Sequence, residues 1–270
     1  MKLYKVVLLS VFAISTACGK KGGEKPAPEN PEKPAATGLL YQWDFEGNIP
    51  IHDFNEITPN VSVVADPLDP ANRVMLCVLP VGEYRTEVCA GASKIHYFYA
   101  DSTNVEHGDE FWVGVRILKM LEYYSGTNAY PSIFQIGPVQ NPVTYPQETS
   151  FGHYQLHLNT KTDKWRLREF KSVYDPNEYA DDIAPLNYGR WEKFVFHCIF
   201  RSNDTGLLEI WKNGVKVYSQ KRQNGIKYDR TRIKWGVYIG AGNSVNSDVK
   251  CYFDDIKIGG ANSSYDEVTP

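Results

Sequence analysis

Short alternations of apolar and polar residues recur along the chain from about Leu40 to its end, and helical periodicity is almost absent. Alternation with a period of two is the pattern of a β-strand with one buried face. The segments that fit this pattern are 40–45, 74–79, 84–89, 110–118, 133–136, 153–159, 165–170, 191–200, 207–211, 215–220, 233–239 and 250–258. Many short strands at this spacing predict an all-β sandwich or barrel. Segment 92–100 fits a helix, a strand or a loop.

One pair of these segments carries a strong hairpin signal. Residues 207–211 and 215–220 are joined by Lys212-Asn213-Gly214. An Asn-Gly pair readily adopts the positive φ angles of a tight hairpin turn. We therefore predict that the two segments pair as neighbouring antiparallel strands.

The first residues of the chain have the pattern of a processing signal. Two early lysines precede an apolar run at 6–14, and small residues at 15–17 lead into Cys18. The run is too short to span a membrane. The segment resembles a bacterial lipoprotein signal, which implies that residues 1–17 are removed and that Cys18 is lipidated. The alternative, a buried helix that ends in an ordinary cysteine, is disfavoured because a linker follows directly.

Residues 18–37 are expected to be the lipidated cysteine and a flexible linker. Segment 19–37 contains only Lys, Gly, Glu, Pro, Asn and Ala before Thr37. Such a segment cannot bury enough apolar surface to offset the entropy lost on ordering, so we predict a tether. These features predict a lipid-anchored protein of the bacterial cell envelope, which meets a membrane only through its N-terminal lipid.

The remaining residues, 38–270, are long enough for one large β domain, and no second linker divides them. The formal net charge of −3 gives no general attraction to nucleic acid, so no such partner is expected. Once Cys18 is assigned to the lipid, the cysteines that remain are Cys77, Cys89, Cys198 and Cys251. An even number in an exported protein permits disulfides without demanding them. No spacing matches a zinc site.

Segment 153–159 has an apolar face and a face rich in hydrogen-bonding groups. Its odd positions are His153, Gln155, His157 and Asn159, and its even positions are Tyr, Leu and Leu. A polar outer face is ordinary for a sheet that meets water. Histidines and amides are also groups that bind neutral and acidic sugars, so the segment is a candidate wall of a sugar site.

Three short stretches that lie far apart in the chain predict one site. They are 84–88, 134–137 and 234–238, each with polar residues at alternate positions. Alternate residues of a strand project from one face of a sheet. Arg85, Gln135, Lys234 and Tyr238 could therefore line one concave surface, and their cationic and amide groups suit an acidic sugar. Taken singly, each stretch could equally be an ordinary ion pair or a solvent-facing strand.

The order of these stretches resembles the jelly-roll polysaccharide lyases, a group that includes alginate lyases, glucuronan lyases and the heparin lyase I type. In the alginate lyases of this fold, the motifs Arg-Thr-Glu-x-Arg, Gln-Ile/Val-His and Tyr-Phe-Lys-x-Gly-x-Tyr-x-Gln recur. Residues 85–88 match the first motif until Cys89 replaces its last arginine. Residues 135–136 match the second until Gly137 replaces its histidine. The third motif keeps its lysine and tyrosine, but Gly240 replaces the final glutamine.

The resemblance implies a concanavalin A-like β-jelly-roll sandwich of two antiparallel sheets, whose first and last strands often pair. It also implies a lyase that removes the C5 proton of a uronate and expels the O4-linked sugar. Arg85 and Gln135 would stabilise the enolate-like dianion. Tyr238 would serve as the acid, or as both acid and base, with Lys234 favouring its ionised form. Glu87 would hold Arg85 in position.

Gly137 leaves the general base open. His153 or His157 could supply an imidazole from the neighbouring strand, or Tyr238 could act alone. Gln155 and Asn159 would bind substrate beside Arg85, Gln135 and Lys234. The alternative function is a surface lipoprotein that binds glycans on the same scaffold without cleaving them.

The expected partner is an acidic polysaccharide such as alginate, glucuronan or a glycosaminoglycan, bound by a monomer that requires no cofactor. A structural calcium ion is a further candidate, because Asp44, Glu46, Asp254 and Asp255 offer hard oxygen ligands near the two ends of the domain. The alternative for these carboxylates is that they cap turns or face solvent. A glycosidase is disfavoured because no strand presents the spaced carboxylates that this chemistry needs.

Overall fold

Strands form nearly all of the regular structure in the part of the chain that the computed structural model describes. That part comprises residues 38–47, 54–90, 98–99, 110–120, 130–139, 154–172, 175–201, 203–222, 224 and 230–270. The strands form two sheets in which every pairing is antiparallel. The all-β prediction is therefore confirmed for these residues.

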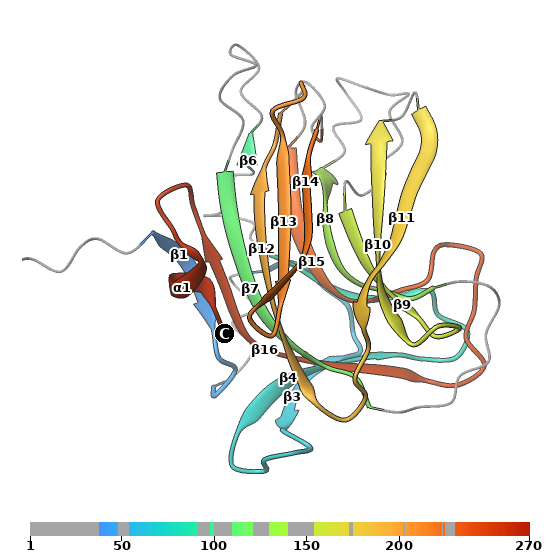
Figure 1. Cartoon of the computed structure of the whole chain (residues 1–270). Coiled ribbons are helices and arrows are strands. Elements are labelled where there is room, and N and C mark those ends of the chain that lie inside the picture. Colours follow the sequence, from blue (N-terminus) through green and yellow to red (C-terminus); the bar gives the residue numbers. More distant parts are fainter. Residues whose placement is uncertain are drawn as a thin grey trace, which may run out of the picture. The chain divides into compact units, whose positions relative to one another are not determined.

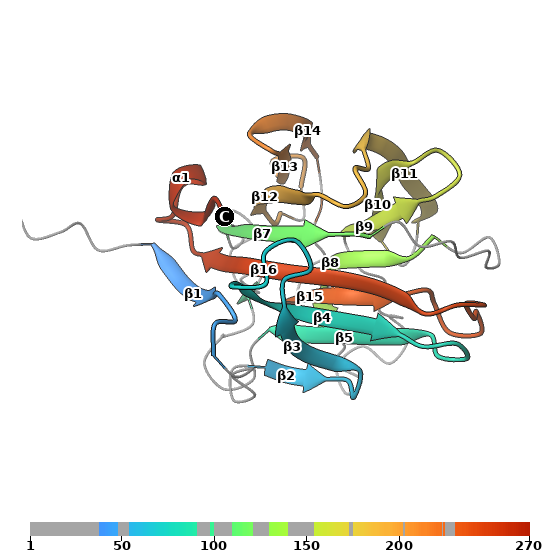
Figure 2. The same ribbon diagram turned by 90° about the horizontal axis from the view of Figure 1, so that it is seen from below.

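The first sheet is built around a long C-terminal strand (Figures 1 and 2). Its order is β14 (Val215–Lys221), β13 (Leu207–Lys212), β12 (Trp191–Ile199), β7 (Glu110–Leu118), β16 (Val249–Gly259), β4 (Arg73–Leu79) and β3 (Val61–Ala65). The strand β1 (Leu39–Trp43) also pairs with β16, as expected for the first and last strands. The pairing thus joins the two ends of the domain.

The second sheet contains all three of the stretches that predict a sugar site. Its order is β11 (Asp175–Pro185), β10 (Lys164–Ser172), β9 (Tyr154–Asn159), β8 (Ser132–Val139), β15 (Arg230–Tyr238), β5 (Arg85–Ala90) and β2 (Phe54–Ile57), and β6 (Phe98–Tyr99) pairs with β15. The order makes β5 and β8 the two neighbours of β15. Residues that are far apart in the chain therefore become adjacent on one sheet.

Aromatic side chains fill the space between the two sheets. The ring centroids of Phe134 in β8 and Phe196 in β12 lie 4.6 Å apart, and those of Trp165 and Phe194 lie 5.0 Å apart. All four side chains are at most 2% exposed. Burial of apolar area on this scale is the main favourable term in folding. The core thus fixes the second sheet against the first through alternate residues of each strand, which leaves the other residues to face outward.

The predicted hairpin is confirmed. The strands β13 and β14 pair around Asn213 and Gly214, whose φ angles are 49° and 85°. Both values are positive, as a tight hairpin turn of this kind requires. The other predicted strands are also present, with boundaries that differ by a few residues.

The sequence pattern missed β2, β3, β11 and a short helix, whereas β6 lies in segment 92–100, for which a strand was one of the alternatives. The strand β11 contains prolines, aspartates and an asparagine, which are rare in central strands. It is tolerated because it lies at the sheet edge and pairs only with β10. The helix α1 (Tyr265–Val268) begins with a capping box at Ser264. It packs beside β7 (Figure 2), where an added Cβ at Gly114 would lie 1.7 Å from the carbonyl oxygen of Val268.

The four cysteines of the domain are all free and buried, which settles the open question of disulfides in favour of thiols. They are Cys77, Cys89, Cys198 and Cys251. Cys77 and Cys251 face each other across β4 and β16. Burial raises the pKa of the Cys77 and Cys198 thiols well above the usual value, so both stay protonated and behave as apolar residues. Within the described residues, no helix has the length and apolar character needed to cross a membrane.

Candidate active site

The outer face of the second sheet carries a set of polar side chains because its strands alternate strictly. In β8, Phe134 and Ile136 enter the core, so Gln135 projects to the opposite face. In β9, Leu156 enters the core in the same way, and Gln155 and His157 flank it on the outer face. The prediction that these stretches share one face of one sheet is therefore confirmed by their register.

Three polar side chains on this face form a continuous hydrogen-bonded chain, which we call the amide chain. Gln155 donates from Nε2 to Oε1 of Gln135 at 3.2 Å. Gln135 in turn donates from Nε2 to Oε1 of Glu87. These side chains are only 3–9% exposed, so the hydrogen bonds replace solvation that burial removes. The amide chain fixes the side-chain orientation of Gln135 between β9 and β5.

Glu87 holds Arg85, as the sequence predicted. The Nε atom of Arg85 lies 3.1 Å from Oε2 of Glu87, and the side chains are 33% and 3% exposed respectively. The guanidinium carbon of Arg85 lies 4.8 Å from the ring centroid of Tyr238 and 5.9 Å from that of Tyr84. The rings and the carboxylate together restrict a long, flexible cation to one position.

Strand register places five residues in one line across the sheet, which we call the cross-strand row. In order from β5 to β10 they are Arg85, Tyr238, Ser132, His157 and Arg166. The register shifts in β15 beside Tyr238 and in β8 beside Ser132, and each shift is of the kind a β-bulge produces. A bulge redirects side chains. The bulges therefore bring Tyr238 into line with His157, which simple alternation would not.

His157 is buried within this row and is contacted on both sides of its ring. Nδ1 donates to the carbonyl oxygen of Tyr130 at 2.7 Å, and Nε2 lies 2.9 Å from Oε1 of Gln155. Burial lowers the pKa of His157 to about 3, against a hydrogen bond to the Tyr130 carbonyl that raises it, and the charges of Arg168 and Arg166 lower it further. His157 is therefore a neutral imidazole at neutral pH, and its single N–H proton lies on Nδ1, which donates to the Tyr130 carbonyl.

Lys234 and Gly236 lie on the outer face of β15, the strand between β8 and β5. Lys234 is 4% exposed and is the register partner of both Gln135 and Cys89. Gly236 has a φ of 139°, and an added Cβ would lie 2.2 Å from the backbone oxygen of Thr86. The close approach of β15 to β5 therefore requires glycine at this position.

The structure changes one expectation about Tyr238. Lys234 was expected to favour its ionised form, but four residues of extended strand separate the two by roughly 13 Å along the chain. The cation whose guanidinium lies over the Tyr238 ring is Arg85, at 4.8 Å.

Gly137 and His153 are the two positions that bear on the identity of the general base. Gly137 is part of β8, and its register partner in β15 is Arg232. His153, the other histidine candidate, lies outside the described residues. The identity of the base therefore stays a prediction.

Asn159 sits at the end of β9 in contacts that belong to a turn. Its Nδ2 donates to Asp182 Oδ1 at 3.0 Å, and its Oδ1 accepts from the backbone nitrogen of Lys161 at 3.2 Å. Asp182 also accepts from Nε of Arg166 at 2.8 Å. Asn159 therefore positions Asp182 and Arg166, and its predicted direct role in binding substrate stays untested.

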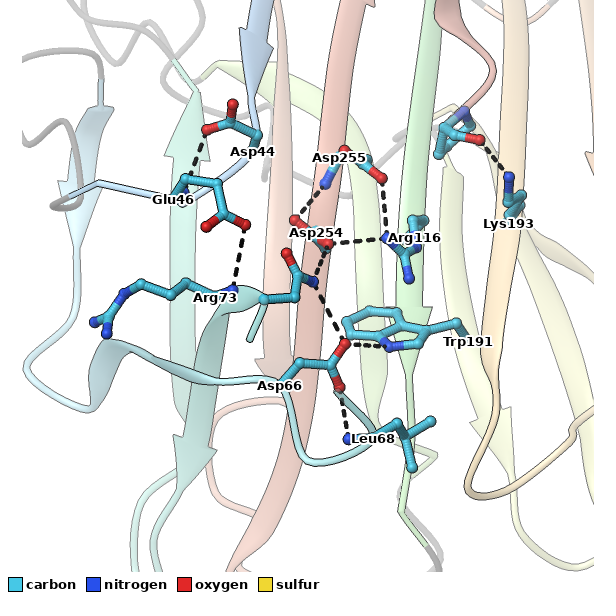
Figure 3. A network of polar contacts seen from close by, with 12 residues as sticks. Asp44, Glu46, Asp66, Leu68, Arg73, Arg116, Trp191, Lys193, Asp254 and Asp255 are labelled. Atoms are coloured by element: carbon cyan, nitrogen blue, oxygen red, sulfur yellow. Dashed lines mark hydrogen bonds and ion pairs between the residues drawn. The ribbon is translucent and has the colours of Figure 1, made fainter. Parts of the chain in front are cut away.

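The carboxylates considered for calcium fall into two separate sets of contacts (Figure 3). Asp254 and Asp255 each lie 3.0 Å from Nη1 of Arg116. Asp44 accepts from the backbone nitrogen of Glu46 at 3.3 Å, which is a turn contact. Among the residues that the structure describes, no group of three or more His, Cys, Asp or Glu side chains could hold a metal ion. The structural calcium ion therefore stays a prediction.

Sequence reasoning missed four residues around the site, which are Tyr130, Ser132, Arg166 and Asp182. A signal for Arg166 was present, because Trp165 and Leu167 alternate with it in β10 and are buried. Tyr130 and Ser132 carry no such signal, since their places depend on the bulge in β8. Ser132 is 0% exposed, and its hydroxyl has no hydrogen-bond partner among the residues that the structure describes.

Comparisons with known proteins agree with this geometry. A family model described as Polysaccharide lyase matches residues 57–257. The solved structure of endo-β-1,4-glucuronan lyase from the fungus Trichoderma reesei is similar with a TM-score of 0.64 and 14% identity, covering 86% of this chain and 98% of that one. The family 7 alginate lyase A1-II′ in complex with the substrate GGMG is similar with a TM-score of 0.56 and 9% identity, covering 78% and 85%.

A third solved structure extends the same likeness. The alginate lyase AlyC3 in complex with dimannuronate has a TM-score of 0.53 and 9% identity, covering 77% of this chain and 80% of that one. No curated protein sequence matches the chain. Identities this low show the fold alone, and that fold is the predicted jelly-roll sandwich of two antiparallel sheets.

Proposed function

The chain belongs to the polysaccharide lyase family, and we propose that it cleaves an acidic, uronate-containing polysaccharide by β-elimination. The observation that carries the proposal is the placement of Arg85. Glu87 and Tyr238 hold this cation at the edge of a buried amide chain. An anionic sugar that meets Arg85 would also meet a phenol capable of proton transfer.

The substrate carboxylate would bind at Arg85, Gln135 and Lys234. The amide of Gln135 has two N–H groups, of which one donates to Glu87. The second can donate to a carboxylate, and the guanidinium of Arg85 is a charged donor to the same group. These donors would be worth most in the transition state, where charge accumulates on the carboxylate oxygens.

Tyr238 would carry out both proton transfers. In its ionised form it takes the proton from C5, and the electron pair of that bond forms the double bond between C4 and C5. The bond between C4 and O4 breaks, and Tyr238 returns the proton to the departing O4. Arg85, whose guanidinium carbon lies 4.8 Å from the ring centroid, would hold the phenol in position for both transfers.

His157 suits a positioning role better than that of the general base. Its lowered pKa, about 3, makes it a weak base at neutral pH. Both of its ring nitrogens also lie within hydrogen-bond distance of protein oxygen atoms. His157 would therefore fix the backbone at Tyr130 through its Nδ1 proton and pack beside Gln155.

The substrate would be a polyuronate, and glucuronan and alginate are the first candidates to assay. The similar solved structures include a glucuronan lyase and an alginate lyase. A glycosaminoglycan is a third candidate because it also contains uronate. Lipidation of Cys18 would place the enzyme at a membrane of the cell envelope, next to polymers outside the cytoplasm.

The proposal is tested by the ultraviolet absorbance of unsaturated uronate ends. The purified protein is incubated with glucuronan, alginate and glycosaminoglycans, and absorbance should rise with at least one of them. Tyr238→Phe should reduce turnover by at least about 100-fold, the usual contribution of an acid–base residue, while binding persists.

Tyr84→Phe is the matched control, because Tyr84 also lies against Arg85 but is more distant, at 5.9 Å. This variant should keep most of its activity. Full activity of Tyr238→Phe would remove Tyr238 from the mechanism. Binding without turnover across the whole panel would instead support a glycan-binding protein.

A further inference from the structure

Arg166 lies at the end of the cross-strand row opposite to Arg85. It is the register partner of His157 in β10, and its side chain is 23% exposed. Asp182 of the edge strand β11 lies 2.8 Å from its Nε atom, and its guanidinium carbon lies 4.8 Å from the ring centroid of Tyr130. Arg166 is therefore held in place on the same face as the proposed active site.

The surroundings of Arg166 repeat those of Arg85. Each arginine uses Nε to contact a carboxylate, at 2.8 Å and 3.1 Å respectively. Each guanidinium also lies 4.8 Å from the centre of a tyrosine ring, Tyr130 in one case and Tyr238 in the other. In both cases a carboxylate and an aromatic ring together restrict the guanidinium to one position. The same local chemistry thus occurs at both ends of the row.

The position of Asp182 is fixed independently of Arg166. Its carboxylate accepts from Asn159 Nδ2 at 3.0 Å and from Thr162 Oγ1 at 3.0 Å. Although partial burial acts to raise the pKa of Asp182, hydrogen bonds from Arg166, Asn159 and Thr162 lower it overall. Asp182 is therefore an anion whose negative charge is shared among several hydrogen-bond donors. It neutralises the positive charge of Arg166 only in part.

Basic side chains gather around Tyr130 and Arg166. Lys161 lies 5.9 Å from the Tyr130 ring, in addition to Arg166 at 4.8 Å. Arg168 is two residues away from Arg166 in β10 and is the register partner of Gln155. An anion would therefore be attracted to this end as well as to Arg85.

The two arginines are too far apart to bind one sugar. Five adjacent strands, from β10 to β5, separate them by four spacings, which is roughly 19 Å. That span exceeds a single sugar residue, and it is bridged by Ser132, His157 and the amide chain. An oligosaccharide that runs across the strands could meet both arginines.

We propose that Arg166 and Tyr130 form a second subsite, which binds a uronate several residues away from the bond that is cleaved. This inference rests on the proposed function, since it assumes a uronate polymer at Arg85. The polymer would lie along the cross-strand row from β5 to β10. Longer oligosaccharides would then bind more tightly than short ones, because only they reach from Arg85 to Arg166.

The experiment uses uronate oligosaccharides from trisaccharide to polymer and the purified full chain. Arg166→Gln should raise KM, and the dissociation constant measured by calorimetry, by at least about tenfold for the longest substrates. It should change neither value for the shortest, which bind at Arg85 alone. Arg166→Lys keeps the charge but loses the planar fork, so it should give an intermediate loss with the same dependence on length.

Arg116→Gln is the matched control. Arg116 also contacts carboxylates and lies 4.6 Å from an aromatic ring, that of Trp191, but it belongs to the other sheet. Equal losses for short and long substrates, or no loss for either Arg166 variant, would overturn the second subsite. A similar loss in Arg116→Gln would overturn it as well. If the protein binds without cleaving, calorimetry still tests the subsite, and only the proposed function fails.

Discussion

Substituting alanine for Gly236 tests whether the close contact between β15 and β5 supports both the fold and the site. The added Cβ would lie 2.2 Å from the backbone oxygen of Thr86 and 2.6 Å from Cα of Glu87. Both neighbours are backbone atoms and cannot move by a change of rotamer. Relief of the clash would therefore separate the two strands and shift Glu87, which anchors Arg85 and Gln135.

The expected loss of stability has two parts. A residue other than glycine held in an unfavourable φ region costs about 1–3 kcal/mol, and the φ of Gly236 is 139°. Overpacking adds about 1–3 kcal/mol. The free energy of unfolding should therefore fall by roughly 2–6 kcal/mol. For a domain of this size, about 2–4 °C of Tm per kcal/mol predicts a decrease of roughly 5–20 °C.

The assay is thermal and urea unfolding followed by circular dichroism. Two glycine controls separate the cost of the φ angle from the cost of overpacking. Gly242 has a φ of 83° but no atom within 4 Å of an added Cβ, so Gly242→Ala should show only the backbone cost. Gly47 has neither constraint, so Gly47→Ala should be close to neutral. A Gly236→Ala variant no less stable than Gly242→Ala would refute the argument from close approach.

Two further predictions concern buried polar groups. The pKa of His157 is about 3 in the folded protein against an ordinary value of 6.5, so the unfolded chain binds more protons between these values. Its contribution to stability is therefore complete above pH 6.5 and is lost as the pH falls toward 3, by at most about 1.4 kcal/mol per pH unit. Urea titrations in this range should show that the free energy of unfolding depends less on pH in His157→Gln than in the unmodified protein. An identical dependence in the two proteins would contradict the lowered pKa of His157. Glu192 accepts from Nε1 of Trp165 at 2.6 Å and pairs with the buried Lys212. Glu192→Ala should lower the free energy of unfolding by about 3–5 kcal/mol, because it leaves the Lys212 charge without its carboxylate. The double variant Lys212→Met with Glu192→Ala should recover part of this loss. If it recovers none, the unpaired charge is not the cause.

Local patterns predicted those strands whose two faces differ in polarity. The alternation in β9 correctly assigned Leu156 to the core and Gln155 to the outer face. The strand β11 escaped prediction because an edge strand needs little propensity of its own when its neighbour supplies the hydrogen bonds. The pairing of Arg85 with Glu87, in contrast, was predictable from the sequence. Alternate residues of one strand share a face whatever the tertiary fold.

The sequence by itself determined the fold class, the strands that carry the site and the face on which Arg85, Gln135 and Tyr238 lie. These properties follow from alternation within single strands, which is a local rule. Only the tertiary structure decided which strands are neighbours and how their registers shift at the bulges. The alignment of Tyr238 with His157 and Arg166 depends on those shifts, and a shift of one residue exchanges the two faces of a strand. Because such shifts arise from packing between distant segments, no local pattern in the chain encodes them.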